Sequence, residues 1–256
     1  MAFDGGYCGR SCRAKISCAS RGNEINAVES WYYGIFTFMI TRVSKTLPDD
    51  TIRRALGEFQ VPVDDDQVIL IQKYMAILLH WNEKLNLTAI RDPLEILHRH
   101  FCESMFGAVA VPINFGRLAD IGSGAGFPGI PMKILRPELE LFLVESNIKK
   151  GTFLAEVLRE LEFVNARVLI NRYEDLSEDL APLDYVCSRA VGEFGSFLDW
   201  AASGGLSAGR VVLWIGGRDM DEVRKSPHWE WQEPIAVPQS LRRYILVGAR
   251  KAETPA

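Results

Sequence analysis

Two kinds of hydrophobic spacing divide the chain near residue 111. Before that point, apolar residues recur every three or four positions, which is typical of amphipathic helices. We expect a first helix from Asp49 or Asp50, either of which would serve as its N-cap. A second helix is expected from residues 64–66 to about Leu85, with an acidic start that suits the helix dipole. Its apolar stripe comprises Val68, Ile71, Met75, Leu78 and Leu79.

A third helix is expected over residues 91–110, where Pro93 stands in the first turn, a position that tolerates proline because its missing amide would be unpaired anyway. Its apolar face would comprise Leu94, Leu97, Phe101 and Met105. The three helices together predict a helical N-terminal cap over residues 39–110.

After residue 111 the pattern changes to short apolar runs that alternate with helical segments. The runs expected to form strands are 117–121, 139–145, 166–170, 183–188 and 210–215, with a last one in 242–251. Helices are expected over 147–161 and 192–205, the second ended by Gly204-Gly205. Alternation of this kind predicts an α/β domain over residues 111–250, with a parallel sheet covered by helices on both faces, followed by a tail over 251–256.

Residues 1–38 differ from the rest of the chain. They hold three of the five cysteines and show no sustained hydrophobic period. We interpret them as a disordered extension or as the product of a misassigned start site, with the natural start near Met39. The apolar run 31–40 is too short to span a membrane, and no small-residue cleavage site follows it, which argues against a secretory signal.

Composition limits the possible functions only mildly. The 256 residues, 48% hydrophobic and 24% charged, suit one large globular domain or one domain plus a smaller one. The formal net charge of −4 gives no general attraction to nucleic acid, so an RNA partner would need a local basic patch. The five cysteines form no C-x-x-C pair, so we expect no metal site or disulfide framework, and reduced thiols in the cytoplasm.

The segment "RLADIGSGAGFPGIPMKIL", residues 117–135, carries the most informative chemistry. Gly124, Gly126 and Gly129 satisfy the G-x-G-x-x-G spacing of dinucleotide-binding loops, which alone is a weak signal. Asp120 would place negative charge close to a pyrophosphate, so it favours a ligand with a cationic end, such as S-adenosylmethionine, over NAD. The alternative is a turn of glycines in which Asp120 only caps a helix.

Three further stretches follow expected strands, where ligands of parallel sheets bind. Glu145 ends the second strand, at the place where an acid accepts hydrogen bonds from ribose hydroxyls. Tyr173 and Glu174 follow the third strand and would border an adenine ring, unless they belong to a solvated acidic loop. Arg189 follows the fourth strand and would face the same site, unless it forms a surface ion pair.

Several ordered strings resemble one family. They are "WNEKLNLTAIRDPLEILHRHFCESM", "ADIGSGAGFPGIPMKILRPELELFLVESNIKKGTFLAEV", "NRYEDL" and "SRAVG". They are similar to the bacterial 16S rRNA guanine-N7 methyltransferase G family, formerly called glucose-inhibited division protein B. The likeness runs from about residue 65 to about residue 250. It implies a class I S-adenosylmethionine-dependent, Rossmann-like α/β fold with a helical N-terminal cap, and methylation of one guanine of 16S rRNA at N7.

The resemblance also implies site residues. The cofactor-binding positions carried over by motif are Gly122, Phe127, Tyr173, Glu174 and Arg189, and Glu145 matches the acid that the class uses for ribose. Asp120, Gly124 and Gly126 join them as candidates from the glycine loop itself. Asn86, Arg99 and His100 match the "NLT" and "RH" strings and are expected near the substrate mouth. The implied partner is 16S rRNA or the small ribosomal subunit, with no membrane and no metal, and we expect a cytoplasmic monomer. Family members often carry Lys-Gly after the fifth strand, where Ile215 or Gly216 stands in this chain and Arg218 is the nearest cation.

The chemistry of guanine N7 fits the residues that the sequence offers. N7 carries an exposed lone pair, so no base has to remove a proton before attack on the methyl group. In-line alignment of N7, methyl carbon and sulfur would then be the main requirement, with Arg189 in an orienting role. The alternatives are a methyltransferase of the same fold with another substrate, an NAD-dependent oxidoreductase, or a methyltransferase-like module without activity.

Overall fold

Helices make up the first part of the chain that the structure describes. This computed structural model describes residues 47–176, 180, 182–189, 192–203 and 208–252. The expectations for residues 1–38, for a helix end at Gly204-Gly205 and for the last residues of the tail lie outside these ranges.

Helix α2 (Asp49–Glu58) begins one or two residues earlier than the sequence predicted. Its N-cap is Pro48, which has no side-chain cap hydrogen bond, so the prediction of an aspartate cap is wrong. Asp49 and Asp50 instead occupy the first turn, where carboxylates interact favourably with the positive end of the helix dipole.

Helix α3 (Asp65–Leu85) confirms the second prediction. Asp64 caps it by accepting from the amide of Gln67, and the Gln67 side chain accepts from the amide of Asp64, a reciprocal capping box. Most of its predicted stripe is buried, with Leu79 half-buried. This helix therefore turns one long apolar face toward the remaining structure.

The third predicted helix is three segments in a row. They are α4 (Pro93–Ile96), the π-helix η1 (Leu97–Cys102) and α5 (Glu103–Ala110). A π-helix closes its hydrogen bonds over five residues instead of four, so successive turns advance by more residues. Phe101 and its neighbours four positions away are buried, whereas Leu94, three positions before the π segment's first residue, is 43% exposed. The prediction of Leu94 on the core face is therefore wrong.

An eight-stranded sheet forms the centre of the part of the chain that the structure describes. Its strands are β1 (Gly116–Ile121), β2 (Leu139–Val144), β3 (Ala166–Leu169), β4 (Tyr185–Ser188), β5 (Arg210–Gly216), β6 (Trp229–Trp231), β7 (Ile235–Ala236) and β8 (Arg243–Arg250). The order is β3-β2-β1-β4-β5-β8-β6, with β7 paired to β8. The first five strands are parallel and β8 runs antiparallel to β5. The six predicted strands are confirmed; β6 and β7 were not predicted.

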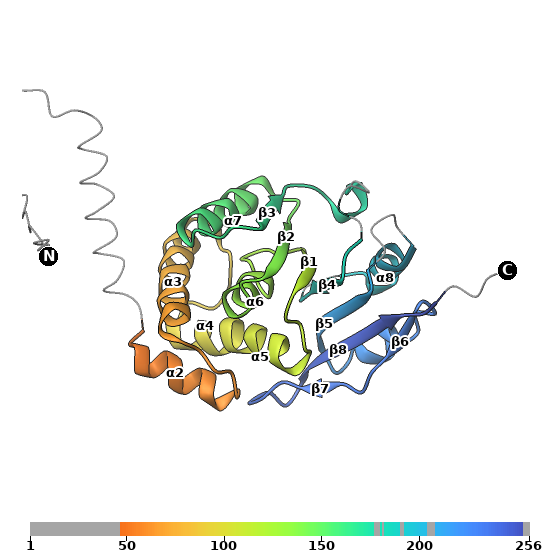
Figure 1. The fold of residues 1–256 in the computed structure, drawn as a ribbon, viewed down its shortest axis with the longest axis horizontal. Coiled ribbons are helices and arrows are strands. Elements are labelled where there is room, and N and C mark those ends of the chain that lie inside the picture. Colours follow the sequence, from red (N-terminus) through yellow and green to blue (C-terminus); the bar gives the residue numbers. More distant parts are fainter. Residues whose placement is uncertain (1–46, 177–179, 181, 190–191, 204–207, 253–256) are drawn as a thin grey trace, which may run out of the picture. The chain divides into compact units, whose positions relative to one another are not determined.

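Helices cover both faces of the sheet, as the alternation predicted (Figure 1). The remaining helices of the described residues are α6 (Gly129–Leu135), α7 (Ile148–Glu160), the short 3₁₀ turn η2 (Tyr173–Asp175), α8 (Phe194–Ser203) and α9 (Met220–Val223). Alternate residues of each strand enter two core clusters: Leu141 and Leu143 pack with the helices of residues 49–110, while Phe142 and Val144 pack with α8.

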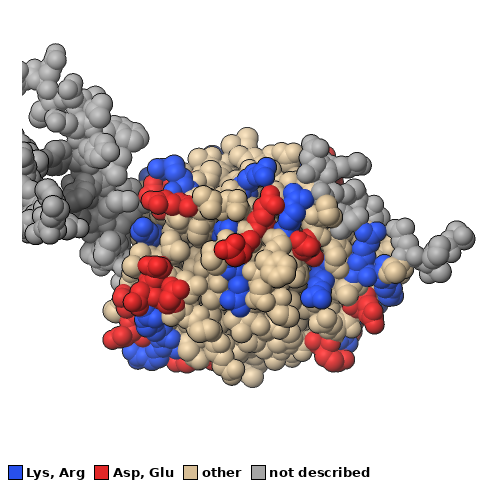
Figure 2. Space-filling model, in the orientation of Figure 1, with Lys and Arg blue, Asp and Glu red and all other residues tan. Residues whose placement is uncertain are grey.

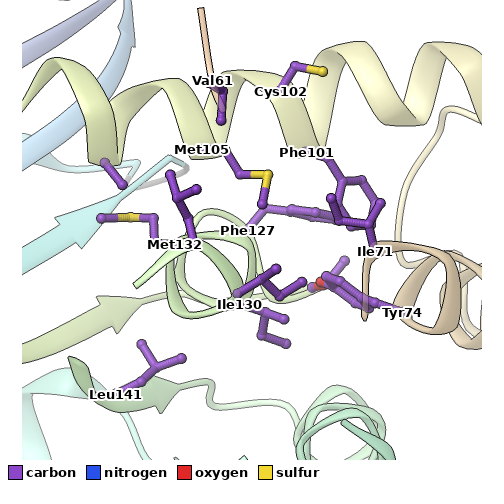
Figure 3. Packing of buried hydrophobic residues seen from close by; sticks show 14 of the residues in the cluster. Val61, Ile71, Tyr74, Phe101, Cys102, Met105, Phe127, Ile130, Met132 and Leu141 are labelled. Carbon is purple, nitrogen blue, oxygen red and sulfur yellow. The ribbon is translucent and has the colours of Figure 1, made fainter. Parts of the chain in front are cut away.

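The first cluster joins the N-terminal helices to the loop that follows β1. Figure 3 shows Tyr74 of α3 and Phe101 of η1 around Phe127, with Met105 and Ile130 beside them. The ring of Phe127 stacks on that of Tyr74 with centroids 5.4 Å apart, and meets Phe101 edge to face at 5.3 Å. The N-terminal helices thereby rest directly on the glycine loop.

Two glycines test how closely the N-terminal helices pack on the sheet. A Cβ on Gly107 of α5 would stand 2.1 Å from the ring of Trp214 on β5, so Gly107→Ala forces the two elements apart. We expect it to lower the free energy of unfolding by about 1–3 kcal/mol. Gly57→Ala, in α2 with no atom within 4 Å of the added methyl group, should raise it by about 0.4–1 kcal/mol. Urea unfolding followed by tryptophan fluorescence measures both, and equal stability of the two variants would contradict the packing.

Candidate active site

The carboxyl ends of β1, β2 and β3 enclose a pocket of about 240 Å³. Its lining includes Gly122, Glu145, Asn171, Arg172, Tyr173 and Glu174. Parallel sheets bind ligands at this edge, next to the point where the strand order reverses, here between β1 and β4. Four of the residues predicted to bind a cofactor, which follow three separate strands, are thus brought together.

The glycines of the loop have positive φ angles that other residues rarely adopt. Gly122, Gly124 and Gly126 have φ of 68°, 57° and 88°. Gly122 lines the pocket, and no atom lies within 4 Å of the Cβ it lacks, so its surroundings leave room for a ligand. At Gly126 a Cβ would stand 2.6 Å from the hydroxyl of Tyr74, so this glycine admits the N-terminal helices instead.

Glu145 anchors the loop to the end of β2. One carboxylate oxygen accepts from the amide of Gly124 at 3.0 Å and the other from the amide of Asn147 at 2.8 Å. The side chain belongs to the pocket wall although the residue is only 7% exposed. Because an ionised carboxylate offers about four acceptor sites, it retains capacity for the hydroxyl groups of a bound sugar.

Asp120 is completely buried beneath the loop. Its Oδ2 accepts from the amide of Gly129 at 3.0 Å, so the side chain caps the start of α6, as the helix-cap alternative described. The carboxyl also has a side-chain hydrogen bond with the Cys187 thiol. Burial raises its pKa to about 7, against the opposing effects of the Gly129 amide and of Arg189. Contact with a cationic ligand stays a prediction.

His100 lies against the loop through Phe127. The two rings stack with centroids 4.7 Å apart, and His100 Nε2 is 2.8 Å from the hydroxyl oxygen of Thr88. Burial and the neighbouring arginines, Arg189 first among them, lower the pKa of His100 to about 3. The imidazole is therefore neutral near pH 7 and positioned by Thr88.

Asn86 and Arg99 are exposed. Asn86 ends α3 in the left-handed conformation, and its Oδ1 accepts from Arg91 at 3.2 Å. The "NLT" and "RH" strings meet through Thr88 and His100. Substrate binding by Asn86 and Arg99 stays a prediction. A second pocket, of about 320 Å³, lies on the N-terminal helices beside Arg91, away from the strand ends.

Arg189 leaves the end of β4 and extends to the π-helix η1. It donates to the carbonyl of Arg99 at 2.9 Å and to the hydroxyl of Ser104 at 3.2 Å, and its Nη2 lies 3.5 Å from Glu103 Oε2. Glu103 is 1% exposed and also contacts Arg99 at 3.5 Å and Arg243 at 2.5 Å. The structure thus places Arg189 at the edge of the strand ends, within a group of charges that the sequence did not predict.

Three residues near the site escaped sequence reasoning. Glu103 is an acid within an apolar helical stretch, and the arginines around it come from distant segments, so no local pattern marks it. The hydroxyl of Tyr74 donates to the carbonyl of Ala125, which only the fold reveals. Asn171 could have been found, because it follows β3 beside Tyr173.

The segment in which family members often carry a lysine is part of the core in this chain. Ile215, which stands near the expected lysine, is 4% exposed and packs in the second core cluster. Among the residues that the structure describes, no group of three or more His, Cys, Asp or Glu side chains could hold a metal ion. No helix in the described ranges is long and apolar enough to cross a membrane.

The buried carboxyl of Asp120 predicts a pH dependence of stability. Its pKa rises from 3.8 to about 7 on folding, so the folded protein holds the proton more tightly and loses this advantage as pH rises through 7. Between pH 5 and pH 8, wild type should lose about 2–3 kcal/mol of unfolding free energy relative to Asp120→Asn. Urea unfolding at both pH values measures the difference; parallel pH profiles would contradict the burial of a titrating carboxyl.

Known proteins match most of this chain. The family described as rRNA small subunit methyltransferase G matches residues 67–240. The ribosomal RNA small subunit methyltransferase G of Xylella fastidiosa (strain 9a5c) is 36% identical over 211 residues, which cover 81% of this chain and 98% of the relative. The protein of the same name from Xanthomonas axonopodis pv. citri (strain 306) is 40% identical over 184 residues, covering 70% of this chain and 84% of the relative.

A solved structure agrees on the architecture. The crystal structure of an S-adenosylmethionine-dependent methyltransferase from Aquifex aeolicus superposes with a TM-score of 0.52 at 11% sequence identity, over 65% of this chain and 97% of that chain. This likeness concerns the fold alone and confirms the Rossmann-like class I prediction. Together with the sequence matches, it confirms the resemblance found in the motifs: the chain belongs to the rRNA small subunit methyltransferase G family.

Proposed function

We propose that this protein transfers a methyl group from S-adenosylmethionine to N7 of one guanine in 16S ribosomal RNA. The observation that carries the proposal is the pocket at the ends of β1, β2 and β3, which gathers Gly122, Glu145, Tyr173 and Glu174 in a chain of the rRNA small subunit methyltransferase G family. Family membership argues against the oxidoreductase alternative, since the same strand-end pocket would otherwise suit either adenosine cofactor.

The pocket offers a place for each part of the cofactor. Glu145, with acceptor capacity left on both oxygens, would bind the ribose hydroxyls. Tyr173 and Glu174 would border the adenine at the end of β3. Asp120, buried one residue before the pocket wall, would favour the cationic methionine end through its negative charge. The cofactor supplies an activated methyl group, and the chain supplies its position.

Methyl transfer to N7 requires alignment more than proton transfer. N7 is an unprotonated acceptor, so no proton has to be removed from it before it attacks the methyl group. His100 is unsuited to acid catalysis near neutral pH because its lowered pKa of about 3 keeps the ring neutral. Cys187 is buried and burial raises its thiol pKa, so it suits a core position rather than covalent catalysis. In-line geometry can then supply about 7–11 kcal/mol of the barrier reduction.

Arg189 would influence the reaction indirectly, by holding η1 in place beside the site. Its donors are already engaged by the carbonyls of Arg99 and His100 and by Ser104. We therefore assign it a positioning role in the proposed reaction, as a brace that holds η1 beside the strand ends. This refines the orienting role that the sequence suggested.

The proposed partner is 16S rRNA or the small ribosomal subunit, met in the cytoplasm by a monomer. Figure 2 shows acidic and basic side chains interspersed on the visible face, in keeping with the net charge of −4. Attraction to RNA would then depend on a local group of arginines or lysines rather than on the whole surface.

The direct test of the proposed function maps the modified base. 16S rRNA from cells with and without the protein would be reduced with borohydride, cleaved at 7-methylguanosine with aniline and read by primer extension. We expect one stop that is present only with the protein, and restored by the purified protein with S-adenosylmethionine. Identical stops in both RNAs would contradict the proposal.

Glu145→Gln tests the cofactor site separately from RNA. Loss of the charged acceptor should weaken binding of S-adenosylhomocysteine by about 10- to 100-fold, since hydrogen bonds to charged groups contribute about 1.5–3 kcal/mol. Isothermal titration calorimetry measures the change. Glu138→Gln, an exposed acid at the other end of β2, is the matched control and should bind as wild type does. Strong binding of NAD instead would favour the oxidoreductase.

A further inference from the structure

We propose that Arg99 and Arg243, gathered with Arg189 on the buried carboxylate of Glu103, form a binding site for a phosphate group of the RNA backbone. This inference rests on the proposed function, because it assigns part of the same substrate to named residues. We call the four side chains the Glu103 cluster.

The charges of the Glu103 cluster do not balance. Glu103 is 1% exposed, and three guanidinium groups lie at 2.5 Å (Arg243), 3.5 Å (Arg99) and 3.5 Å (Arg189) from its oxygens. The Glu103 carboxylate neutralises one of the three cations and Asp120 acts on Arg189 as a more distant acid, so a formal charge of at least +1 remains. No other acid is among the described ion-pair partners of these arginines. An excess of this kind, held together by a buried acid, suits an anionic ligand.

The three arginines divide into one structural member and two available members. Arg189 is 18% exposed and engages two backbone carbonyls and a hydroxyl besides Glu103. Arg99 and Arg243 are 45% and 28% exposed, and their described side-chain contact is Glu103 alone. Each guanidinium carries five N–H donors in a planar fork, so most donors of these two remain free for phosphate oxygens. Nε of Arg243 is even buried without a partner.

Repulsion between the arginines opposes part of their attraction to Glu103. Burial lowers the pKa of Arg189 and that of Arg243. Repulsion from the neighbouring arginines lowers both pKa values further. A single arginine would be enough to neutralise the carboxylate of Glu103, whereas three arginines contact it. The three come from η1, the end of β4 and the start of β8, so the fold brings them together from widely separated parts of the chain.

The Glu103 cluster adjoins the strand-end site. Arg99 precedes His100, whose ring stacks on Phe127 of the glycine loop, and Arg189 directly follows β4, the neighbour of β1. A phosphate bound to Arg99 and Arg243 would therefore fix the RNA at the rim where the guanine has to enter. The phosphate contact would position the substrate and carry no base information.

The salt dependence of RNA binding tests the inference. Binding of a 16S rRNA fragment would be measured at several salt concentrations for wild type, Arg99→Gln, Arg243→Gln and the double variant. One phosphate contact contributes about 0.7–0.9 to the slope of log K against log salt, so the double variant should lose about that amount and each single variant a part of it. Arg167→Gln is the matched control, because this 66%-exposed arginine pairs with Glu140 at the amino end of β3.

Two further measurements keep the outcome clear. S-adenosylhomocysteine binding and thermal unfolding of the double variant should match wild type within a factor of two and within a few degrees. A variant that unfolds earlier but keeps the wild-type salt slope would overturn the inference, because the arginines would then serve the fold alone. An equal loss of slope in Arg167→Gln would overturn it too. If instead wild type leaves 16S rRNA unmethylated, the proposed function fails while the slope still reports on phosphate binding.

Discussion

The contact between the N-terminal helices and the glycine loop is the constraint on which the site depends. Phe127 lies between the rings of Tyr74 and His100, and the hydroxyl of Tyr74 donates to the carbonyl of Ala125. Glu145 and Asp120 hold the same loop from the sheet side, through the amides of Gly124 and Gly129. The loop can keep its three positive φ angles because it is fixed from both sides, and the pocket opens where Gly122 has no neighbour.

Most of the fold was predictable because short apolar runs and period-3.6 stripes directly encode strands and helices. The structure departs from the prediction at places where the hydrophobic spacing does not reveal the local backbone geometry. The π-helix η1 shifts the apolar face, which exposes Leu94, and Pro48 rather than an aspartate precedes α2. Strands β6 and β7 span three and two residues, too few for alternation to be recognised, and they exist because β8 offers them an edge.

The site was predictable to the extent that it follows strand ends. Gly122, Glu145 and Tyr173 come after separate strands, and the topology of parallel sheets alone places them together. The direction that a side chain takes from a strand end is a different matter. Arg189 was placed at the correct edge, but its guanidinium extends to η1 because Glu103 is there, and that acid's partners lie far away in sequence.

The antiparallel strand β8 has a consequence for synthesis of the chain. It enters the sheet between β5 and β6 and contributes Arg243 to the Glu103 cluster, although Glu103 emerges from the ribosome about 140 residues earlier. Domains fold as their chain emerges, N-terminal parts first. A nascent chain halted before β8 would bury the acid without one of its counter-charges. The addition of β8 to the sheet and the completion of the Glu103 cluster are thus a single late step in folding during synthesis.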